Sequence, residues 1–325
     1  MPNTTHPRRR RRSRISWPRV FLLVLAALLL LAVLVVGAYR LWARSPEVEV
    51  PPPAGSAQAS QVIGQLQRKD DFYTVLISGL DDHNGGSDTN ILLGFDARGG
   101  AVRGVSIPRD SGVWYRGKAH KVNAASKQGA EELAAVLEDT LGIPVDFTVQ
   151  VDLGAFAALV NAIGGVDFNV PIDMDYDDPL QDLSIHFKAG LQHLDGEEAL
   201  KVVRFRQNND GTGYGTQDIG RIATQQAFLK TVAAKMLANP GKISEYVQIF
   251  KDHVDTELEL GELAWFGEKA LLMGLDNISF TTLPGEWSGR RSLYMLDGEA
   301  VLALVNEALN PYELDRTAED LNILE

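Results

Sequence analysis

The chain has 325 residues and a formal net charge of −12, and it contains no cysteine. Its N-terminal stretch up to Arg44 holds nine arginines and no acidic residue, so the remainder carries 22 basic against 43 acidic residues, a net charge of −21. That balance argues against nucleic acid as a partner, because binding to a phosphate backbone requires a broad basic surface. The lack of cysteine excludes disulfides, thiolate metal sites and cysteine nucleophiles.

A long apolar stretch follows the arginine-rich segment. Residues 20–42 are mostly Leu, Val, Ala and Phe, and at about 1.5 Å per residue they cover roughly the 30 Å core of a lipid bilayer. A cleaved signal peptide is the alternative, but its apolar region is usually only about 7–15 residues long. We expect one N-terminal transmembrane helix at 20–42 and a cytoplasmic tail at 1–19, because basic residues stay inside. The rest of the chain would then lie outside the cell membrane.

The remaining chain divides into three parts. Residues 43–69 are rich in Pro, Ala, Gly and Ser and predict an extended tether. Strand and helix patterns alternate over 70–311 without a long linker, which predicts one extracytoplasmic α/β domain, and 312–325 would form a C-terminal tail. Apolar periodicity and turn residues predict strands at 72–78, 90–95, 102–107, 145–151, 166–170 and 278–283. They also predict a helical region that begins at Lys121 and continues over 131–141, and helices at 153–163, 219–237, 242–250, 260–272 and 298–309.

Two groups of aspartates could bind metal. Asp81 and Asp88 are expected at facing strand ends, and two hard oxygen ligands are what Mg²⁺ usually takes from a protein, although Asp and Gly are also common in ordinary turns. Four more aspartates crowd a predicted loop over 173–178. The spacing lacks the glycine and glutamate of an EF-hand, so a solvated or locally hydrogen-bonding loop is favoured over a calcium site.

Arginines form the second set of candidate site residues. Arg109 follows a proline at a predicted strand end, where open α/β sheets place ligand contacts. Arg204 and Arg206 would share one face of an extended segment, and Arg221 and Gln225 one face of a helix. Three guanidinium groups could converge there on a polyanion such as a diphosphate. The alternative is that these arginines pair with carboxylates on a solvated face.

Taken together, these segments resemble the LytR-CpsA-Psr family of membrane-anchored cell-envelope glycopolymer transferases. The resemblance depends on many short motifs that occur in one order. They are Ile77-Ser78-Gly79-Leu80-Asp81, Ser87-Asp88-Thr89, Ser106-Ile107-Pro108-Arg109-Asp110, Lys121-Val122-Asn123-Ala124-Ala125, Gly164-Gly165-Val166, Met174-Asp175-Tyr176-Asp177-Asp178-Pro179, Leu194-Asp195-Gly196 with Ala199-Leu200, Val203-Arg204-Phe205-Arg206, Asp218-Ile219-Gly220-Arg221 and Gln225-Gln226.

The resemblance implies an α-β-α sandwich with a central mixed sheet and a pocket for a polyprenyl chain. It implies transfer of a glycopolymer phosphate from a polyprenyl-diphosphate carrier to a peptidoglycan hydroxyl, with hydrolysis of the diphosphate as a side activity. Matching positions assign the roles. Asp81 and Asp88 would hold Mg²⁺, Asp88 would accept the hydroxyl proton, Arg109, Arg206 and Arg221 would bind diphosphate oxygens, Arg204, Asp218 and Gln225 would complete or orient that cluster, and Lys121 would contact the substrate.

Three positions depart from the family pattern. Thr224 stands where an arginine often precedes the paired glutamines, Asp82-His83 replaces small or basic residues, and the loop over 207–217 looks long. A non-catalytic envelope module that binds polyprenyl diphosphates or glycans is therefore an alternative, and so is a membrane-bound regulator. The short arginine-rich tail is too small to fold as a DNA-binding domain. No Gly-x-Ser-x-Gly or His-Glu-x-x-His motif supports serine hydrolase or zinc peptidase chemistry.

Overall fold

The computed structural model describes residues 42–48, 67–80, 86–179, 183–214 and 218–324. The chain forms two units, Met1–Arg44 and Ser45–Glu325, and the second holds the α/β domain. Apart from Trp42, the span predicted at 20–42 lies outside the described residues. Within the described ranges, no helix is both long and apolar enough to cross a membrane.

The centre of the domain is a six-stranded sheet in the order β11-β6-β1-β2-β3-β12. Neighbouring strands are antiparallel in β1–β2, β2–β3 and β6–β11 and parallel in β1–β6 and β3–β12, so the predicted mixed sheet is confirmed. Its strands are β1 (Phe72–Leu80), β2 (Ser87–Asp96), β3 (Ala101–Ser106), β6 (Phe147–Val151), β11 (Val254–Thr256) and β12 (Ile278–Thr282).

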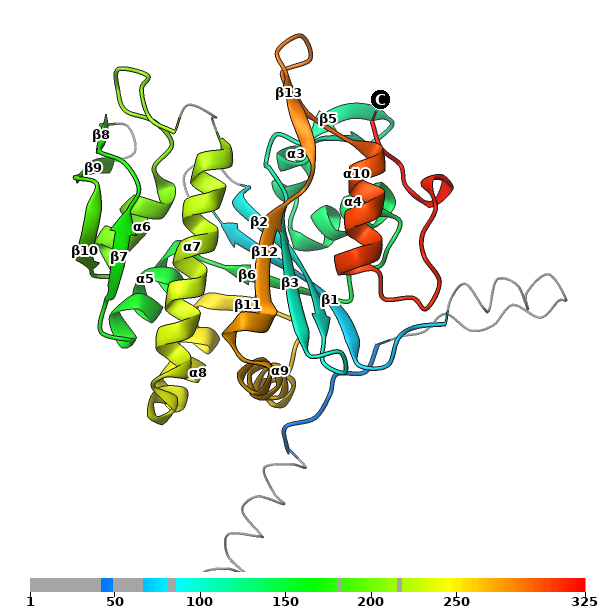
Figure 1. Ribbon diagram of the computed structural model, residues 1–325, viewed down its shortest axis with the longest axis horizontal. Coiled ribbons are helices and arrows are strands. Elements are labelled where there is room, and N and C mark those ends of the chain that lie inside the picture. The colour runs from blue at the N-terminus through cyan, green and yellow to red at the C-terminus, as the bar shows by residue number, and fades with distance from the viewer. Residues whose placement is uncertain (1–41, 49–66, 81–85, 180–182, 215–217, 325) are drawn as a thin grey trace, which may run out of the picture. The chain divides into compact units, whose positions relative to one another are not determined.

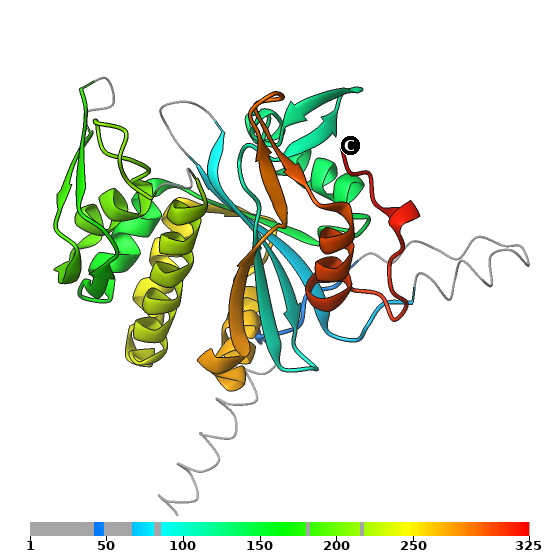
Figure 2. The same cartoon turned by 45° about the horizontal axis from the view of Figure 1, so that its top comes forward.

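Helices cover both faces of this sheet (Figures 1 and 2). On one face, Leu76 and Leu92 pack in a core with α4 (Ala130–Leu141), α10 (Gly298–Leu304) and the π-helical turn that follows α10. On the other face, Tyr73 and Phe95 pack edge-to-face against Phe266 of α9 (Leu260–Met273). Because β1 is buried on both sides, its sequence is a nearly continuous apolar run, as predicted for a central strand.

A third core lies outside the sheet, among α5 (Leu153–Ala162), α6 (Gly196–Arg204), α7 (Asp218–Leu237) and two antiparallel strand pairs. Helix α8 (Ile243–His253) packs beside α5. One pair is the hairpin of β8 (Met174–Asp178) and β9 (Leu183–Phe187), and the other joins the flanking strands β7 (Val166–Val170) and β10 (Gly190–Leu194). The loop predicted over 173–178 is wrong, because most of this acidic run is strand β8.

The aspartates of the acidic run bond to nearby side chains, as the non-metal interpretation predicted. Asp173 binds Lys188 at 2.8 Å, and His186 lies 2.8 Å from Asp175 and 3.3 Å from Asp177. The amide of Ala189 and the ammonium of Lys188 hold the pKa of the Asp173 carboxyl below its usual range. These carboxylates therefore act as local cross-strand partners.

Two further hairpins, unpredicted from the sequence, lie side by side. They are β4 (Gly112–Tyr115) with β5 (Lys118–Lys121), and β13 (Gly285–Ser288) with β14 (Leu293–Leu296). A bridge between Ser111 and Tyr294 joins them. The short helix α3 (Asn123–Ser126) follows β5. The segment after residue 311 packs against β4, where Ile323 bridges to Val113 and Leu324 is buried.

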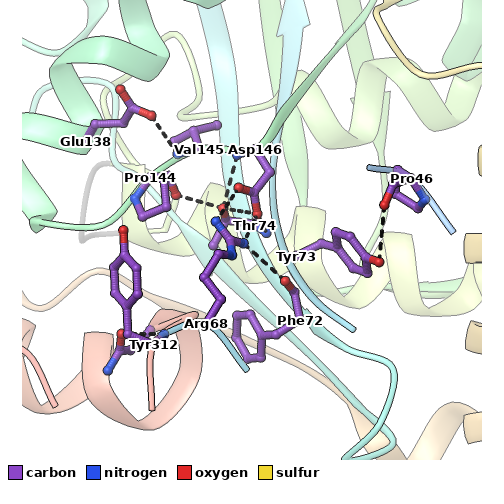
Figure 3. Close-up of polar contacts among 11 residues, drawn as sticks. Pro46, Arg68, Phe72, Tyr73, Thr74, Glu138, Pro144, Val145, Asp146 and Tyr312 are labelled. Atoms are coloured by element: carbon purple, nitrogen blue, oxygen red, sulfur yellow. Dashed lines mark hydrogen bonds and ion pairs between the residues drawn. The ribbon is translucent and has the colours of Figure 1, made fainter. Parts of the chain in front are cut away.

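A buried ion pair fastens the start of the domain to the sheet (Figure 3). Arg68 binds both carboxylate oxygens of Asp146, at 2.8 and 2.6 Å, and the Asp146 side chain is only 1% exposed. Thr74 of β1 donates its amide to the same carboxylate at 2.8 Å. Because the hydrogen bonds to Asp146 involve a charged group, they are stronger than the same number of neutral hydrogen bonds.

Candidate functional site

Four strands of the sheet end, and two begin, at a single edge. Strands β1, β3, β6 and β12 run toward this edge. Strand β2 starts from it because β2 is antiparallel to β1 and β3, and β11 starts from it because β11 is antiparallel to β6. Figure 1 shows the N-terminal end of α7 at the same end of the domain. Open α/β sheets place their ligands at the carboxyl ends of their strands. Of the predicted site residues, Arg109 follows the end of β3 and Asp88 lies next to the start of β2 at this edge.

Asp88 occupies a β-bulge at this edge. Gly79 pairs with Thr89 and Leu80 pairs with Ser87, which leaves Asp88 as the extra residue of β2. Bulges are frequent beside active sites, where they redirect a side chain. The backbone of Asp88 therefore stands at the predicted place, although the short strand expected from residue 90 in fact begins at Ser87.

Ser87 fixes the backbone next to Asp88. Its hydroxyl lies 2.8 Å from the Gly79 carbonyl and 2.7 Å from that of Thr89, and its amide donates to the Ser126 hydroxyl at 3.1 Å. The Ser126 hydroxyl in turn donates to Asn123 at the start of α3. The motif that opens α3 thus supports the bulge. Sequence reasoning did not assign this role to Ser87 or Ser126, although both lie in or beside motifs of the resemblance.

The predicted metal pair is only partly described. Asp81 lies outside the described residues, and Asp88 is described by its backbone alone. Among the side chains that the structure does describe, no cluster of three or more His, Asp and Glu is placed to hold a metal ion. Magnesium binding at Asp81 and Asp88 therefore stays a prediction.

Arg109 leaves the end of β3 as predicted. Pro108 turns the chain away from Ser106, the last residue of β3, and Asn123 donates its amide to the Arg109 carbonyl at 3.1 Å. The Arg109 side chain is half-buried. Its backbone therefore lies between the strand end and α3, on the same edge as Asp88.

Lys121 forms an ion pair with Asp110, the residue that follows Arg109 in the chain. The Lys121 ammonium lies 2.9 Å from the Asp110 carboxylate and 5.7 Å from the ring centre of Trp287. The side chain is 41% exposed, so it can still reach a ligand. Lys121 ends strand β5 and does not open a helix, which corrects the helical region predicted from this residue onward.

Two adjacent glutamines clamp the N-terminal half of α7. Gln226 donates to the Ser106 hydroxyl and to the Thr281 carbonyl, both at 2.9 Å, which ties α7 to the ends of β3 and β12. Gln225 donates to the Val203 carbonyl at 3.1 Å, which ties α7 to the last turn of α6. Neighbouring residues on a helix point about 100° apart, so one pair of glutamines can hold two different elements.

This clamp holds together the two helices that carry three of the predicted arginines. Arg221 lies one turn before Gln225 and is only 2% exposed. Arg204 is the last residue of α6 and follows Val203, whose carbonyl Gln225 binds, and Arg206 lies two residues beyond Arg204. The prediction that Arg204 and Arg206 share a strand is wrong, because α6 continues through Arg204. Asp218 is the first residue of α7.

Tyr214 packs the long loop onto α7, a contact that sequence reasoning missed. Its hydroxyl lies 2.8 Å from the Thr224 hydroxyl, and its ring meets Phe205 edge-to-face at 5.6 Å. A Cβ at Gly220 would stand 2.3 Å from Tyr214, so glycine is required for this contact. Burial raises the pKa of the Tyr214 hydroxyl. The sequence feature that could have revealed this contact is an aromatic residue in the loop, Tyr214, followed by a glycine in the first turn of the helix, Gly220.

The fold and the edge together define an α/β domain that has an arginine and an aspartate at its strand ends and an arginine-bearing helix tied to the same edge, a class suited to anionic ligands. The LytR_cpsA_psr family model matches residues 49–311, and the chain belongs to this family.

Individual relatives agree with this assignment. The chain is 30% identical over 258 residues to TagV of Bacillus subtilis, a polyisoprenyl-teichoic acid–peptidoglycan teichoic acid transferase; the match is 74% of this chain and 64% of TagV. TagU of Bacillus cereus is 29% identical over 186 residues, 55% of this chain and 59% of TagU. The chain thus spans less than two thirds of both relatives.

Solved structures share the fold. The crystal structure of B. subtilis TagV is 28% identical and superimposes with a TM-score of 0.59 over 72% of this chain and 94% of that one. A structure of TagT bound to LI-WTA, at 24% identity and a TM-score of 0.57, covers 73% of this chain and 89% of that one.

Proposed function

We propose that the chain is a membrane-anchored phosphotransferase of cell-wall biogenesis. It would move a glycopolymer phosphate from a polyprenyl-diphosphate carrier to a peptidoglycan hydroxyl on the outer side of the cell membrane. Family membership and the names of TagV and TagU support the reaction class. The observation that carries the proposal is the clamp of Gln225 and Gln226, which assembles arginine-bearing segments from β3, α6 and α7 at one edge.

Phosphoryl transfer depends more on neutralising the charge of the phosphate oxygens than on a covalent bond between substrate and protein. The acceptor oxygen forms a bond to the phosphorus that carries the glycopolymer, and the bond from that phosphorus to the bridging oxygen breaks, so polyprenyl phosphate leaves. The acceptor proton passes to Asp88. Arg109, Arg206 and Arg221 stabilise the charge on the phosphoryl oxygens, which is the main contribution proteins make to phosphoryl transfer. Water in place of the acceptor would give hydrolysis.

Magnesium at Asp81 and Asp88 is part of the proposal. Asp88 is the extra residue of the bulge at the sheet's strand ends, and Asp81 follows Leu80, the last residue of β1, in the sequence. Carboxylate oxygens with substrate phosphate and water are the usual ligands of Mg²⁺. When bound, the ion would neutralise the diphosphate. Arg204, Asp218 and Lys121 would orient the substrate around it.

The test uses the compact unit Ser45–Glu325 with a synthetic polyprenyl-diphosphate glycan and peptidoglycan, with and without Mg²⁺. Polyprenyl species are followed by mass spectrometry. We expect metal-dependent formation of polyprenyl phosphate, reduced about a hundredfold or more by Arg109→Ala, as for loss of one transition-state donor. Arg98→Ala is the matched control, because Arg98 lies in the β2–β3 turn at the opposite edge and is 69% exposed.

Two results would contradict the proposal. If Arg109→Ala or Asp88→Ala transfers the glycopolymer as fast as the parent chain, that residue does not have the role assigned to it. Tight binding of the diphosphate without turnover, even with peptidoglycan and metal present, would favour the non-catalytic envelope module. Circular dichroism of each variant separates loss of chemistry from loss of fold.

A further inference from the structure

The two small hairpins carry an unusual surface of exposed tryptophans and cations. Trp114 of β4 and Trp287 of β13 are 41% and 42% exposed, although large aromatic side chains are normally buried. Val113 and Tyr115, on either side of Trp114, are buried in the domain core, so Trp114 projects from the outer face of its hairpin. Exposed apolar surface of this kind marks interaction sites.

Strand register places Lys121 on the same face. Gly112 pairs with Lys121 and Trp114 pairs with Ala119, and residues that pair directly or stand two apart point to one side of a sheet. The Lys121 ammonium then lies over the Trp287 ring of the neighbouring hairpin. Lys121 thus shares a face with Trp114 and contacts Trp287, and we name Trp114, Lys121 and Trp287 the hairpin platform.

The charge of the hairpins is opposite to that of the domain. Residues 109–121 contain four basic residues and one acidic residue, and residues 285–296 contain two basic residues and one acidic residue. These segments are therefore net positive by three and by one, in a chain whose part beyond Arg44 is net −21. Lys118 and Arg290 are both exposed at the turns of their hairpins. A polyanion would be repelled by the rest of the domain and held here.

The hairpin platform also lies beside the proposed active site. Strand β4 begins three residues after Arg109, and Lys121 pairs with Asp110. Figures 1 and 2 both show the two hairpins next to each other at the end of the domain where β2 begins. A chain attached to a diphosphate at Arg109 would cross these hairpins as it leaves the site.

We propose that the hairpin platform binds the sugar-phosphate chain of the donor glycopolymer, an inference that rests on the proposed function. Indole rings stack on the apolar faces of sugar rings, and the cations pair with the phosphates between them. The platform sets donor preference by polymer length and charge, and it takes no part in bond breaking.

Binding is tested without catalysis. The full chain in detergent is titrated into a carrier-free, fluorescently labelled poly(ribitol phosphate) bearing N-acetylglucosamine, and anisotropy gives the Kd. Trp287→Ala and Trp114→Ala should each weaken binding about tenfold, as loss of an interface hot spot does. Arg290→Glu, at an exposed turn, should also weaken it. Leu191→Ala and Lys251→Ala, exposed residues elsewhere, serve as matched controls.

Three outcomes would overturn the inference. They are no binding of the polymer, equal binding by the platform variants and the parent chain, or tighter binding of uncharged chitohexaose, which would assign the platform to the acceptor glycan. A donor that carries only a disaccharide tests the proposed transfer reaction without the platform, so Trp287→Ala should transfer it as fast as the parent chain does. If the parent chain itself does not transfer this short donor, the phosphotransferase proposal is refuted, and the result on polymer binding is not affected.

Discussion

Replacing Thr224 by arginine, the residue that often stands there in the family, tests how this chain builds its site. Thr224 is 5% exposed. Its hydroxyl donates to the Gly220 carbonyl at 3.0 Å, so the Tyr214 hydroxyl must be the donor of the 2.8 Å bond between Tyr214 and Thr224. An arginine at this position has to displace Tyr214 or enter a filled space.

The expected cost follows from these contacts. Overpacking a buried position costs about 1–3 kcal/mol. Loss of the two hydrogen bonds costs about 1 kcal/mol each. We therefore expect Thr224→Arg to lower the free energy of unfolding by about 3–5 kcal/mol. Transfer activity should fall as well, because the loop that follows Arg206 loses its attachment to α7.

Urea unfolding of Ser45–Glu325, followed by tryptophan fluorescence, measures this effect. Thr224→Ser keeps both hydrogen bonds and should cost only about 1 kcal/mol for the lost methyl group. Thr224→Val keeps the shape, leaves the Tyr214 hydroxyl without its acceptor and should cost about 1–3 kcal/mol. An arginine variant as stable as the parent, or faster in transfer, would refute the reasoning and mean that Tyr214 readily gives way.

Three further changes test other parts of the domain. Asp146→Ala leaves the Arg68 guanidinium buried without its carboxylate and should cost about 3–5 kcal/mol in urea unfolding. Gln226→Ala removes two hydrogen bonds of 2.9 Å and should lower kcat in the transfer assay more than it raises KM, since it misplaces α7. The hydrogen bond to Asp175 raises the pKa of His186 above its ordinary 6.5. Protonated His186 therefore stabilises the β8–β9 hairpin at low pH, and this contribution disappears as pH rises through the raised pKa. An NMR titration in which Asp175→Asn leaves the His186 pKa unchanged would contradict this.

The strands of the central sheet could be predicted because their burial leaves a strong pattern. β1 is covered on both faces and shows as an apolar run, and α7 shows as a long stretch without helix breakers. The hairpins could not be predicted as easily. β5 reads Lys-Ala-His-Lys and has no buried residue, so its pairing depends on β4 and not on its own composition.

Two secondary-structure predictions were wrong although a local sequence pattern indicated the observed structure. The segment with Arg204 and Arg206 was predicted to be extended, yet Asp195 and Glu198 form a capping box, which marks the start of a helix. In β8, Met174 is buried while Asp175 is exposed, so the acidic run alternates as a strand with one face inward. In both cases a local spacing carried more information than composition.

The candidate site could be predicted as a set of residues but not as an arrangement. Arg109 and Asp88 follow from strand ends, whose common edge is set by the antiparallel order of β1, β2 and β3. The position of Arg221 depends instead on hydrogen bonds from Gln226 to Ser106 and from Gln225 to Val203, which are 120 and 22 residues away in the chain. No local pattern reveals such partners.

The sheet's polarity and the chain's charge together explain why an anionic ligand would approach only one end of the domain. Four strands end at that edge; the loop after β3 carries Arg109, and the chain beyond β3 and beyond β12 forms the two basic hairpins. The acidic remainder repels a polyanion over about one Debye length, roughly 8 Å at physiological ionic strength. A diphosphate with an attached polymer is therefore guided toward Arg109 before any specific contact forms. High salt should slow this capture more than it slows the chemical step, because the buried Arg221 is screened less than the exposed cations.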